Sequence, residues 1–292
     1  MTTRDSYYGH PIIKPPVWKK EIGWYLFTGG LAGASASLAF AAEVSGNRRL
    51  ARTSRLVAAA AVNVSPALLI KDLGRPERFL NMLRMFKPTS PMSVGSWILA
   101  ASGGAQSVAA GCEVLGVMPK VRVTSQAAAG LLGPALSTYT AALIADTAVP
   151  VWHDAHRELP AVFAASSCAS AGAAAMMLGH EGSTGPARRL AVLGGAASLG
   201  LSQTMEKRLG MVGEPYHKGK TGGYMRASKA STALGLVATV AGKGLVRRAG
   251  GGLLLAGAAL ERFAVFNAGF DSAADPRYTV EPQRERLAER RG

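Results

Sequence analysis

Acidic and hydroxyl side chains stand within the apolar part of this sequence, where a charge is destabilising. Tyr139 and Asp146 lie seven residues apart in one apolar stretch, which predicts that they share a helix face within about two turns. Thr138 adds a hydroxyl beside Tyr139. A carboxyl group inside a membrane helix usually faces the bundle interior and binds a proton or a ligand. The alternative is that Asp146 lies at the helix end and only reaches the membrane interface.

Further acids stand near the ends of other apolar stretches, at Glu43, Glu113, Glu206 and Glu261. Glu261 precedes Arg262, and charges within a membrane span tend to pair. Buried acids of this kind relay protons, because burial raises the pKa of a carboxyl group. Glu43, Asp72 and Glu261 are therefore candidates for proton relay. For each acid alone, a position at the membrane interface is the simpler interpretation.

A charged segment, residues 71–79 (KDLGRPERF), follows the second apolar stretch. Its glycine permits a tight turn, and its proline restricts the preceding arginine to extended backbone. Four charged side chains in this segment predict a charge-assisted network at the membrane surface. These are Asp72, Arg75, Glu77 and Arg78. The alternative is a solvated loop at the interface.

Histidine and cysteine do not form the pattern of a metal site. The five histidines lie in polar segments, in a short loop or at a helix end: His10, His153, His156, His180 and His217. A haem b held between membrane helices needs two histidines that face each other. Cys112 and Cys168 lack the spacing of cluster ligands and fit small buried apolar residues. We therefore predict that this chain holds no haem and no metal.

Long apolar segments must position these residues. Only 17% of the 292 residues are charged and 48% are hydrophobic, whereas soluble proteins carry about 25% charged residues. A helix needs about 20 mostly apolar residues to cross a bilayer. Candidate segments are residues 22–42, 56–70, 93–118, 125–149, 159–178, 190–204, 227–240 and 250–270. The second, sixth and seventh are short. We predict an all-α, polytopic membrane helix bundle with about eight transmembrane helices.

The distribution of charge divides the chain into three parts. We predict an N-terminal interfacial segment (1–21), a transmembrane bundle (22–270) and a charged C-terminal tail (271–292). The formal net charge of +15 fits basic loops that face anionic membrane lipids. It does not predict nucleic-acid binding, because the basic residues lie between apolar segments rather than on one face. We see no cleavable signal peptide, so the first apolar segment is expected to stay as a transmembrane helix.

The segment from Asp72 to Phe79 (DLGRPERF) resembles the DLGRPxRF signature of the NrfD/PsrC family. That family comprises the membrane subunits of respiratory molybdo- and iron–sulfur oxidoreductases. The stretch from Tyr139, with residues 150–152 (PVW) and 159–163 (LPAVF), resembles the family's fourth and fifth helices. Residues 7–18 and 25–30 resemble its N-terminus, so the resemblance spans most of the chain.

The resemblance implies a haem-free bundle that binds a quinone, menaquinone or ubiquinone, near one membrane face. It also implies a docked ferredoxin-like iron–sulfur subunit, a molybdenum or tungsten catalytic subunit beyond it, and the bacterial cytoplasmic (inner) membrane. In the family, a tyrosine of the fourth helix contacts the quinone, and Tyr139 occupies the matching motif. A tyrosine hydroxyl and a carboxylic acid can donate to quinone carbonyls. Asp146 and Thr138 are therefore further quinone-binding candidates.

The same resemblance carries expectations for the signature segment and for the first helix. Asp72, Arg75, Glu77 and Arg78 are expected to brace the face that meets the iron–sulfur partner. The family's polysulfide reductases also use a histidine in the first helix. Residues 27–32 of this chain hold no histidine.

We predict a membrane subunit that anchors a respiratory complex and passes electrons between an iron–sulfur partner and a quinone. A proton-coupled transporter is one alternative, because acids within membrane spans suit transport. The sequence has no clear internal repeat and no broken helix pair in support of that alternative. A passive membrane anchor is the other. A copurifying iron–sulfur subunit would favour the redox function over transport, and quinone-dependent turnover would exclude the passive anchor.

Overall fold

The computed structural model describes residues 12–75 and 77–290, and of Arg78 it describes the backbone but not the side chain. The motif residues before position 12, including Tyr7, Tyr8 and His10, lie outside the described residues. Every regular element of the described chain is a helix, and eight of the helices have 20 or more residues. These are α1 (Lys20–Val44), α2 (Arg48–Asp72), α4 (Pro91–Leu115), α5 (Pro119–Ala145), α7 (Leu159–Leu178), α8 (Gly185–Leu209), α9 (Gly219–Ala241) and α10 (Gly244–Ala274).

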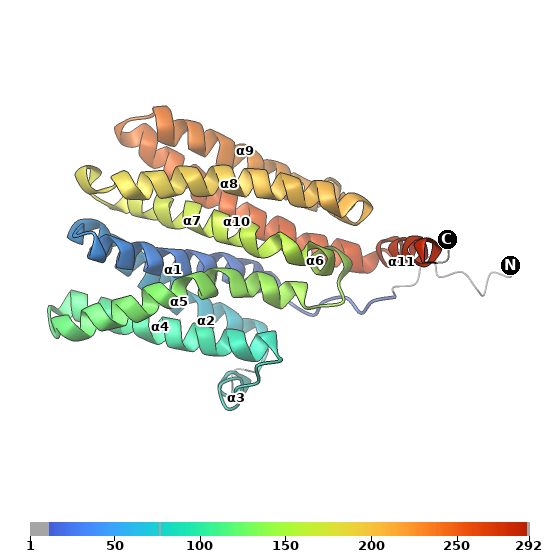
Figure 1. Cartoon of the computed structure of the whole chain (residues 1–292), viewed down its shortest axis with the longest axis horizontal. Helices are drawn as coiled ribbons and strands as arrows, with labels where there is room; N and C mark the ends of the chain where they lie inside the picture. Colours follow the sequence, from blue (N-terminus) through green and yellow to red (C-terminus); the bar gives the residue numbers. More distant parts are fainter. Residues whose placement is uncertain (1–11, 76, 291–292) are drawn as a thin grey trace.

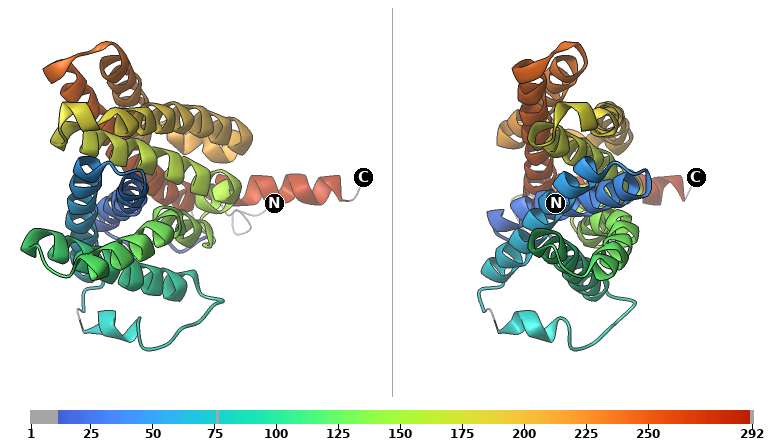
Figure 2. Two further views of the ribbon diagram at one scale, coloured as in Figure 1. Left: turned by 60° about the vertical axis from the view of Figure 1, so that its left-hand side comes forward. Right: turned by 90° about the vertical axis from the view of Figure 1, so that its left-hand side faces the viewer.

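Shorter helices connect or follow the long ones. They are α3 (Arg78–Asn81), α6 (Pro150–Asp154), η2 (Ala155–Arg157), η3 (Glu181–Ser183), η4 (Gly210–Tyr216) and α11 (Arg277–Glu289). The segment that holds α3 stands away from the bundle, and α11 extends from one end of it (Figures 1 and 2).

The long helices run side by side in two groups, α1, α2, α4 and α5 in one and α7 to α10 in the other (Figure 1). Helix α1 joins the groups, because it packs against α2 and α5 and also against α7 and α10. The connections α1–α2, α4–α5, α7–α8 and α9–α10 gather at one end of the bundle. The start of α1, the end of α5 and helix α11 lie at the other end (Figure 1).

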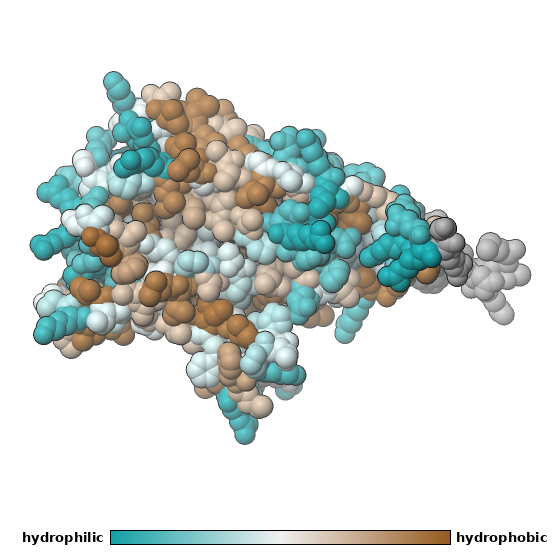
Figure 3. All heavy atoms as spheres, in the orientation of Figure 1, coloured by the Kyte–Doolittle hydropathy of each residue, from teal (hydrophilic) through white to brown (hydrophobic). Residues whose placement is uncertain are grey.

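The structure confirms the predicted polytopic helical bundle. Within the described chain it lowers the number of candidate membrane spans from about eight to six. Six of the long helices are both long and apolar enough to cross a membrane: α1, α2, α4, α5, α7 and α10. Helices α8 and α9 have the length, at 25 and 23 residues, but their sequences are more polar. Apolar residues cover the middle of the visible face, and hydrophilic residues cluster towards its ends (Figure 3).

The short predicted segments are longer helices in the structure. The second apolar stretch, expected at 56–70, is the central part of α2, which begins at Arg48 and ends at Asp72. Its first two turns are rich in arginine, so hydropathy alone does not detect them. Asn47 caps this start, because its side chain accepts a hydrogen bond from the Leu50 amide at 3.2 Å.

Small residues let the helices approach closely, as is common in membrane bundles. Where α1 crosses α5, a Cβ atom added to Gly33 would lie 2.4 Å from the carbonyl oxygen of Gly133. Where α10 crosses α9, a Cβ atom on Gly257 would lie 2.3 Å from the hydroxyl of Thr232. Larger side chains at these glycines would push the helix pairs apart.

The C-terminal residues are helical and contact the bundle. The predicted boundary at residue 270 falls within α10, which continues to Ala274. Beyond it, α11 carries Tyr278, whose hydroxyl donates to Glu214 of η4 at 3.0 Å. Lys218 also pairs with Glu214, at 2.9 Å. The start of α11 is therefore tied to the connection between α8 and α9.

Candidate functional site

Tyr139, near the end of α5, borders a small cavity of about 70 Å³. The cavity lies where the segment before α1, the end of α2, the α2–α4 connection and α4 meet α5. Trp18 and Asp72 line it together with Met82 and Met92. Tertiary packing therefore brings Asp72 of the signature segment beside Tyr139, although the two residues are far apart in the sequence.

The ring of Tyr139 is held against Gly95 of α4. A Cβ atom added to Gly95 would lie 2.3 Å from Cε2 of the tyrosine ring, so only glycine leaves room for this ring position. The Tyr139 hydroxyl is buried and has no hydrogen-bond partner among the described residues. A buried polar group without a partner usually marks the place of a ligand or a water molecule. Tyr139, which lines this cavity, thus carries a hydrogen-bond donor that has no partner within the described chain.

Asp72 is the last residue of α2, and its side chain is partly buried. Its Oδ1 atom accepts a hydrogen bond from the backbone amide of Lys19 at 2.8 Å. This bond ties the end of α2 to the residue that precedes α1. No described side chain pairs with the Asp72 carboxylate.

The structure separates Asp146 and Thr138 from this cavity. Helix α5 ends at Ala145, and Asp146 is its exposed C-cap residue. The spacing of seven residues therefore does not place Asp146 on a continuous helix face with Tyr139. The hydroxyl of Thr138 donates to the carbonyl oxygen of Pro134 at 2.9 Å. Thr138 borders a different pocket, together with Ser37 and Arg189. The assignment of Asp146 and Thr138 to a quinone remains a prediction that this geometry does not support.

The signature segment does not form a closed charge network among the described residues. Arg75 and Glu77 are exposed, and neither makes a hydrogen bond or ion pair within the described chain. Asp72 turns inward, to the Lys19 amide, rather than towards them. The side chain of Arg78 lies outside the described residues.

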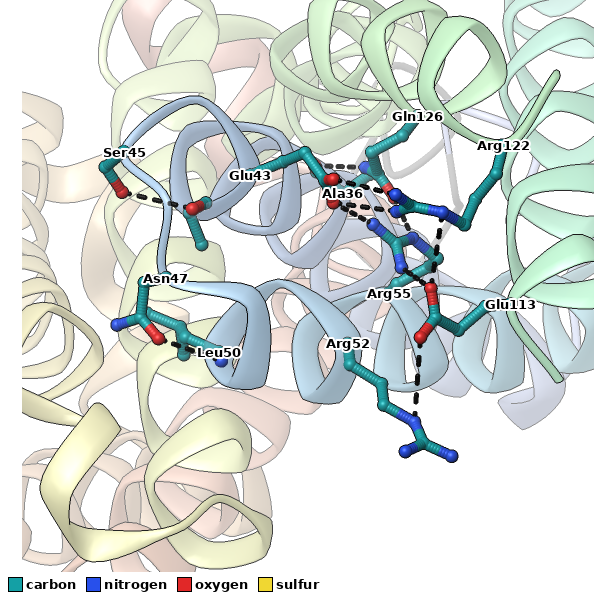
Figure 4. Close-up of polar contacts among 11 residues, drawn as sticks. Ala36, Glu43, Ser45, Asn47, Leu50, Arg52, Arg55, Glu113, Arg122 and Gln126 are labelled. Atoms are coloured by element: carbon teal, nitrogen blue, oxygen red, sulfur yellow. Dashed lines mark hydrogen bonds and ion pairs between the residues drawn. The ribbon is translucent and has the colours of Figure 1, made fainter. Parts of the chain in front are cut away.

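A second polar cluster, the Arg55 network, joins α1, α2, α4 and α5 (Figure 4). Its members are Glu43, Arg55, Glu113, Arg122 and Gln126. Arg55 is only 2% exposed. It donates to Gln126 at 2.8 Å, to Glu43 at 2.5 Å and also to Glu113. Arg122 binds both carboxylate oxygens of Glu43, at 2.8 and 2.9 Å.

The Arg55 network lies at the opposite end of the bundle from Tyr139. Arg122 and Tyr139 share α5 and stand about 25 Å apart along it, at a rise of 1.5 Å per residue. Sequence reasoning singled out Glu43 and Glu113 but missed Arg55 and Arg122. Arg55 directly precedes the apolar stretch 56–70, and an arginine at that position was the available signal, because an unpaired charge beside a membrane span would be destabilising.

A third polar cluster holds α10 against α7 and α8. Glu261 and Arg262 are almost fully buried and pair with each other at 3.3 Å, as expected from their sequence. Arg262 donates to the Phe163 carbonyl oxygen at 2.8 Å and to Ser167 at 3.1 Å. Ser198 donates to Glu261 at 2.5 Å. Glu261 thus lies in the half of the bundle that does not contain Tyr139.

Polar groups continue from α8 into η4. Glu206 pairs with Lys229 at 2.7 Å and lies 3.6 Å from a ring nitrogen of His217. Tyr216 is buried, and its hydroxyl has no partner among the described residues. Burial raises the pKa of Tyr216, and the charges of Glu206 and Glu261 raise it further. The Tyr216 hydroxyl therefore stays protonated at neutral pH.

Within residues 12–75 and 77–290, no three histidine, cysteine or acidic side chains are grouped so that they could hold a metal ion. The absence of metal and haem from the chain stays a prediction.

A comparison with known protein families identifies the family of this chain. The family model described as polysulphide reductase, NrfD, matches residues 12–181, more than half of the 292 residues. The match includes the Tyr139 cavity and the Arg55 network, whereas Glu261 and Arg262 lie beyond it. Comparison with curated proteins found no match. Because the family model covers more than half of the chain, this chain belongs to the NrfD family of polysulphide reductase membrane subunits.

Proposed function

We propose that this chain binds a quinone at the Tyr139 cavity and passes electrons between that quinone and an iron–sulfur partner. As an NrfD-family chain it is a multi-pass membrane subunit of a polysulphide reductase-type complex. One observation carries the quinone assignment. The buried Tyr139 hydroxyl has no partner within the described chain, and Tyr139 lines a cavity together with Asp72.

The cavity walls suit a quinone ring. A quinone carbonyl accepts a hydrogen bond, and the Tyr139 hydroxyl can donate one. Aromatic and aliphatic side chains, including Trp18, Tyr25 and Leu143, form the rest of the wall. At about 70 Å³ the cavity is smaller than a typical ligand pocket of about 300 Å³ or more. Entry of a ring therefore requires Met82 or Met92 to move, which the flexible methionine side chain allows.

Proton exchange at this site is assigned to Asp72. Bound quinone supplies the two-electron chemistry, which also consumes or releases two protons. Asp72 borders the cavity and lies beside Lys19 at the end of the bundle, so its carboxyl group can exchange protons with the surface. Glu43 and Glu261 stay candidates for longer relays. Glu43 lies in the Arg55 network and Glu261 in the α7–α10 group, and neither residue borders the Tyr139 cavity.

The iron–sulfur partner is assigned to the same end of the bundle. Arg75 and Glu77 are exposed there, and their side chains are unpaired within the described chain. The α2–α4 connection also exposes Leu80, Met85 and Phe86 on a segment that stands away from the bundle (Figure 2). Exposed apolar residues beside charged ones are typical of interaction surfaces. The partner is a ferredoxin-like subunit, with a molybdenum or tungsten subunit beyond it, in a bacterial cytoplasmic membrane.

Replacing Tyr139 by phenylalanine tests the quinone assignment. Tyr139→Phe removes one hydrogen-bond donor and keeps the ring against Gly95. A hydrogen bond contributes about 1 kcal/mol, so we expect kcat/KM for the quinone to fall about fivefold to tenfold. Electron transfer from the partner subunit to a soluble dye should stay unchanged. Both rates are measured on the purified complex.

Tyr224→Phe is the matched control, because Tyr224 of α9 is exposed and lies outside the cavity. Equal quinone kinetics in the Tyr139→Phe and Tyr224→Phe complexes would refute the assignment. A passive anchor predicts a complex without quinone-dependent turnover. A proton-coupled transporter predicts that no iron–sulfur subunit copurifies with the chain.

A further inference from the structure

A larger cavity lies at the end of the bundle opposite the Tyr139 cavity. Its volume is about 600 Å³, and it opens between the end of α1, the start of α2 and the α4–α5 connection. The Arg55 network forms its inner wall (Figure 4). Two glutamates and two arginines of that network bind each other, so the inner wall is neutral overall. The charged residues at the mouth of the cavity therefore determine whether it favours an anion or a cation.

The arginines at that mouth outnumber the acidic side chains that could neutralise them. Arg48 lines the cavity and is exposed, and its guanidinium makes no hydrogen bond or ion pair with any residue between 12 and 290 that the structure describes. Arg52 is 65% exposed, and among the described residues it pairs only with Glu113, at the long distance of 3.7 Å. Glu113 is already bound by Arg55. The mouth thus carries excess positive charge that the protein itself does not neutralise.

The start of α5 adds a second, independent attraction for an anion. Helix α5 begins at Pro119, which lines the cavity. No side chain caps this start, so the amides of Lys120 and Val121 have no acceptor within the helix. Helix N-termini carry partial positive charge and bind phosphate and similar anions. An anion beside Arg48 would also lie near these amides.

The cavity has an apolar rim that continues onto the outer surface of the bundle. Val117 and Val123 line it and are 41% and 42% exposed, and neighbouring Met118 is 59% exposed. These side chains stand at the end of two helices that are long and apolar enough to cross a membrane, α4 and α5, and the ends of such helices lie near the lipid head groups. A fully soluble anion would gain nothing from them, whereas a lipid contacts them with its glycerol and acyl groups.

We propose that this cavity binds the phosphate group of an anionic phospholipid. Arg48 pairs with the phosphate at the mouth, the uncapped start of α5 faces it, and Val117 and Val123 contact the apolar part of the same lipid. The ligand binds between α1–α2 and α4–α5 and therefore stabilises the contact of those two hairpins. This site is distinct from the proposed quinone site and does not depend on it.

The test measures thermal unfolding of the purified, delipidated complex in a neutral detergent while lipid is added. The probes are phosphatidylglycerol, phosphatidylcholine and inorganic phosphate. Phosphatidylglycerol should raise the unfolding temperature in a saturable manner, with little effect from the other two. Arg48→Gln should weaken the apparent affinity for phosphatidylglycerol about fivefold, since a basic residue near a membrane surface contributes about 1 kcal/mol.

Arg248→Gln is the matched control. Arg248 lies in α10 at the same end of the bundle, is exposed, and lies outside the cavity. Equal affinities in the two variants would overturn the proposal, as would equal stabilisation by phosphatidylcholine. Stabilisation by inorganic phosphate alone would show a site for a free anion and would also refute the lipid assignment. If Arg48→Gln fails to assemble, native mass spectrometry of the wild-type complex must show retained phosphatidylglycerol.

Discussion

Removal of Arg262 tests how the buried charges hold the second group of helices together. Arg262→Met keeps a long, flexible side chain and deletes the guanidinium group. Glu261 then stays buried without its counter-charge, with the hydroxyls of Ser198 and Ser202 as donors. The carbonyl oxygen of Phe163 loses its hydrogen bond from the arginine.

The expected loss follows from these contacts. Arg262 makes an ion pair of 3.3 Å and two further hydrogen bonds of 2.8 and 3.1 Å. Its guanidinium also lies 3.5 Å from the centre of the Phe163 ring. Removing one partner of a buried pair lowers the free energy of unfolding by about 3–5 kcal/mol. Replacing both partners by neutral side chains is much less harmful, so Glu261→Gln in the Arg262→Met background should restore about 2 kcal/mol or more.

The assay is unfolding by SDS in mixed micelles, followed by the loss of helical circular dichroism. Arg248→Met provides the control, because Arg248 is an exposed arginine of the same helix. A surface substitution of this kind should change the free energy of unfolding by no more than about 0.5 kcal/mol. If Arg262→Met is as stable as Arg248→Met, the ion pair does not stabilise the bundle. If the double variant is no more stable than Arg262→Met, the loss does not come from an uncompensated charge.

Two further predictions concern the Tyr139 cavity and the C-terminal helix. Gly95→Ala should displace the Tyr139 ring, because the added Cβ atom would lie 2.3 Å from it, and quinone-linked turnover should fall at least as much as in Tyr139→Phe. Gly104→Ala on the same helix meets no atom within 4 Å and should leave turnover unchanged, so equal rates in the two alanine variants would count against this packing. Hydrogen bonds from Lys218 and Tyr278 hold the pKa of Glu214 below its ordinary value of 4.5. The stabilisation from Glu214 is therefore complete above pH 4.5 and is lost as the pH falls through the lowered pKa. Hydrogen exchange in α11 should accelerate in that acidic range for the wild type and show no such step in Glu214→Gln, and a step that persists in the variant would contradict this role.

The long helices were predictable from the sequence because apolar length is a local property. All eight predicted segments correspond to long helices, and the pairing of Glu261 with Arg262 followed from their adjacency. The limits of α2 were less predictable, since its arginine-rich start lowers the local hydropathy. Helix α2 includes these residues because Asn47 caps its first turn and Glu43 and Glu113 neutralise Arg55.

The seven-residue spacing of Tyr139 and Asp146 shows where local reasoning fails. The spacing places two residues on one face only while the helix continues, and α5 ends at Ala145. The signature segment shows the same limit. Its charges suggested a network within the segment, but the Asp72 carboxylate accepts a hydrogen bond from the Lys19 amide instead.

The sequence by itself determined that this chain is a membrane bundle and which family it resembles, because hydropathy and short motifs are written in neighbouring residues. Tertiary structure alone decided that Asp72 and Tyr139 share a cavity and that Gly95 makes room for the tyrosine ring. It also decided that Arg55 joins four helices through Glu43 and Glu113. These residues come from different helices, and no periodicity within one helix records which other helix will pack against it.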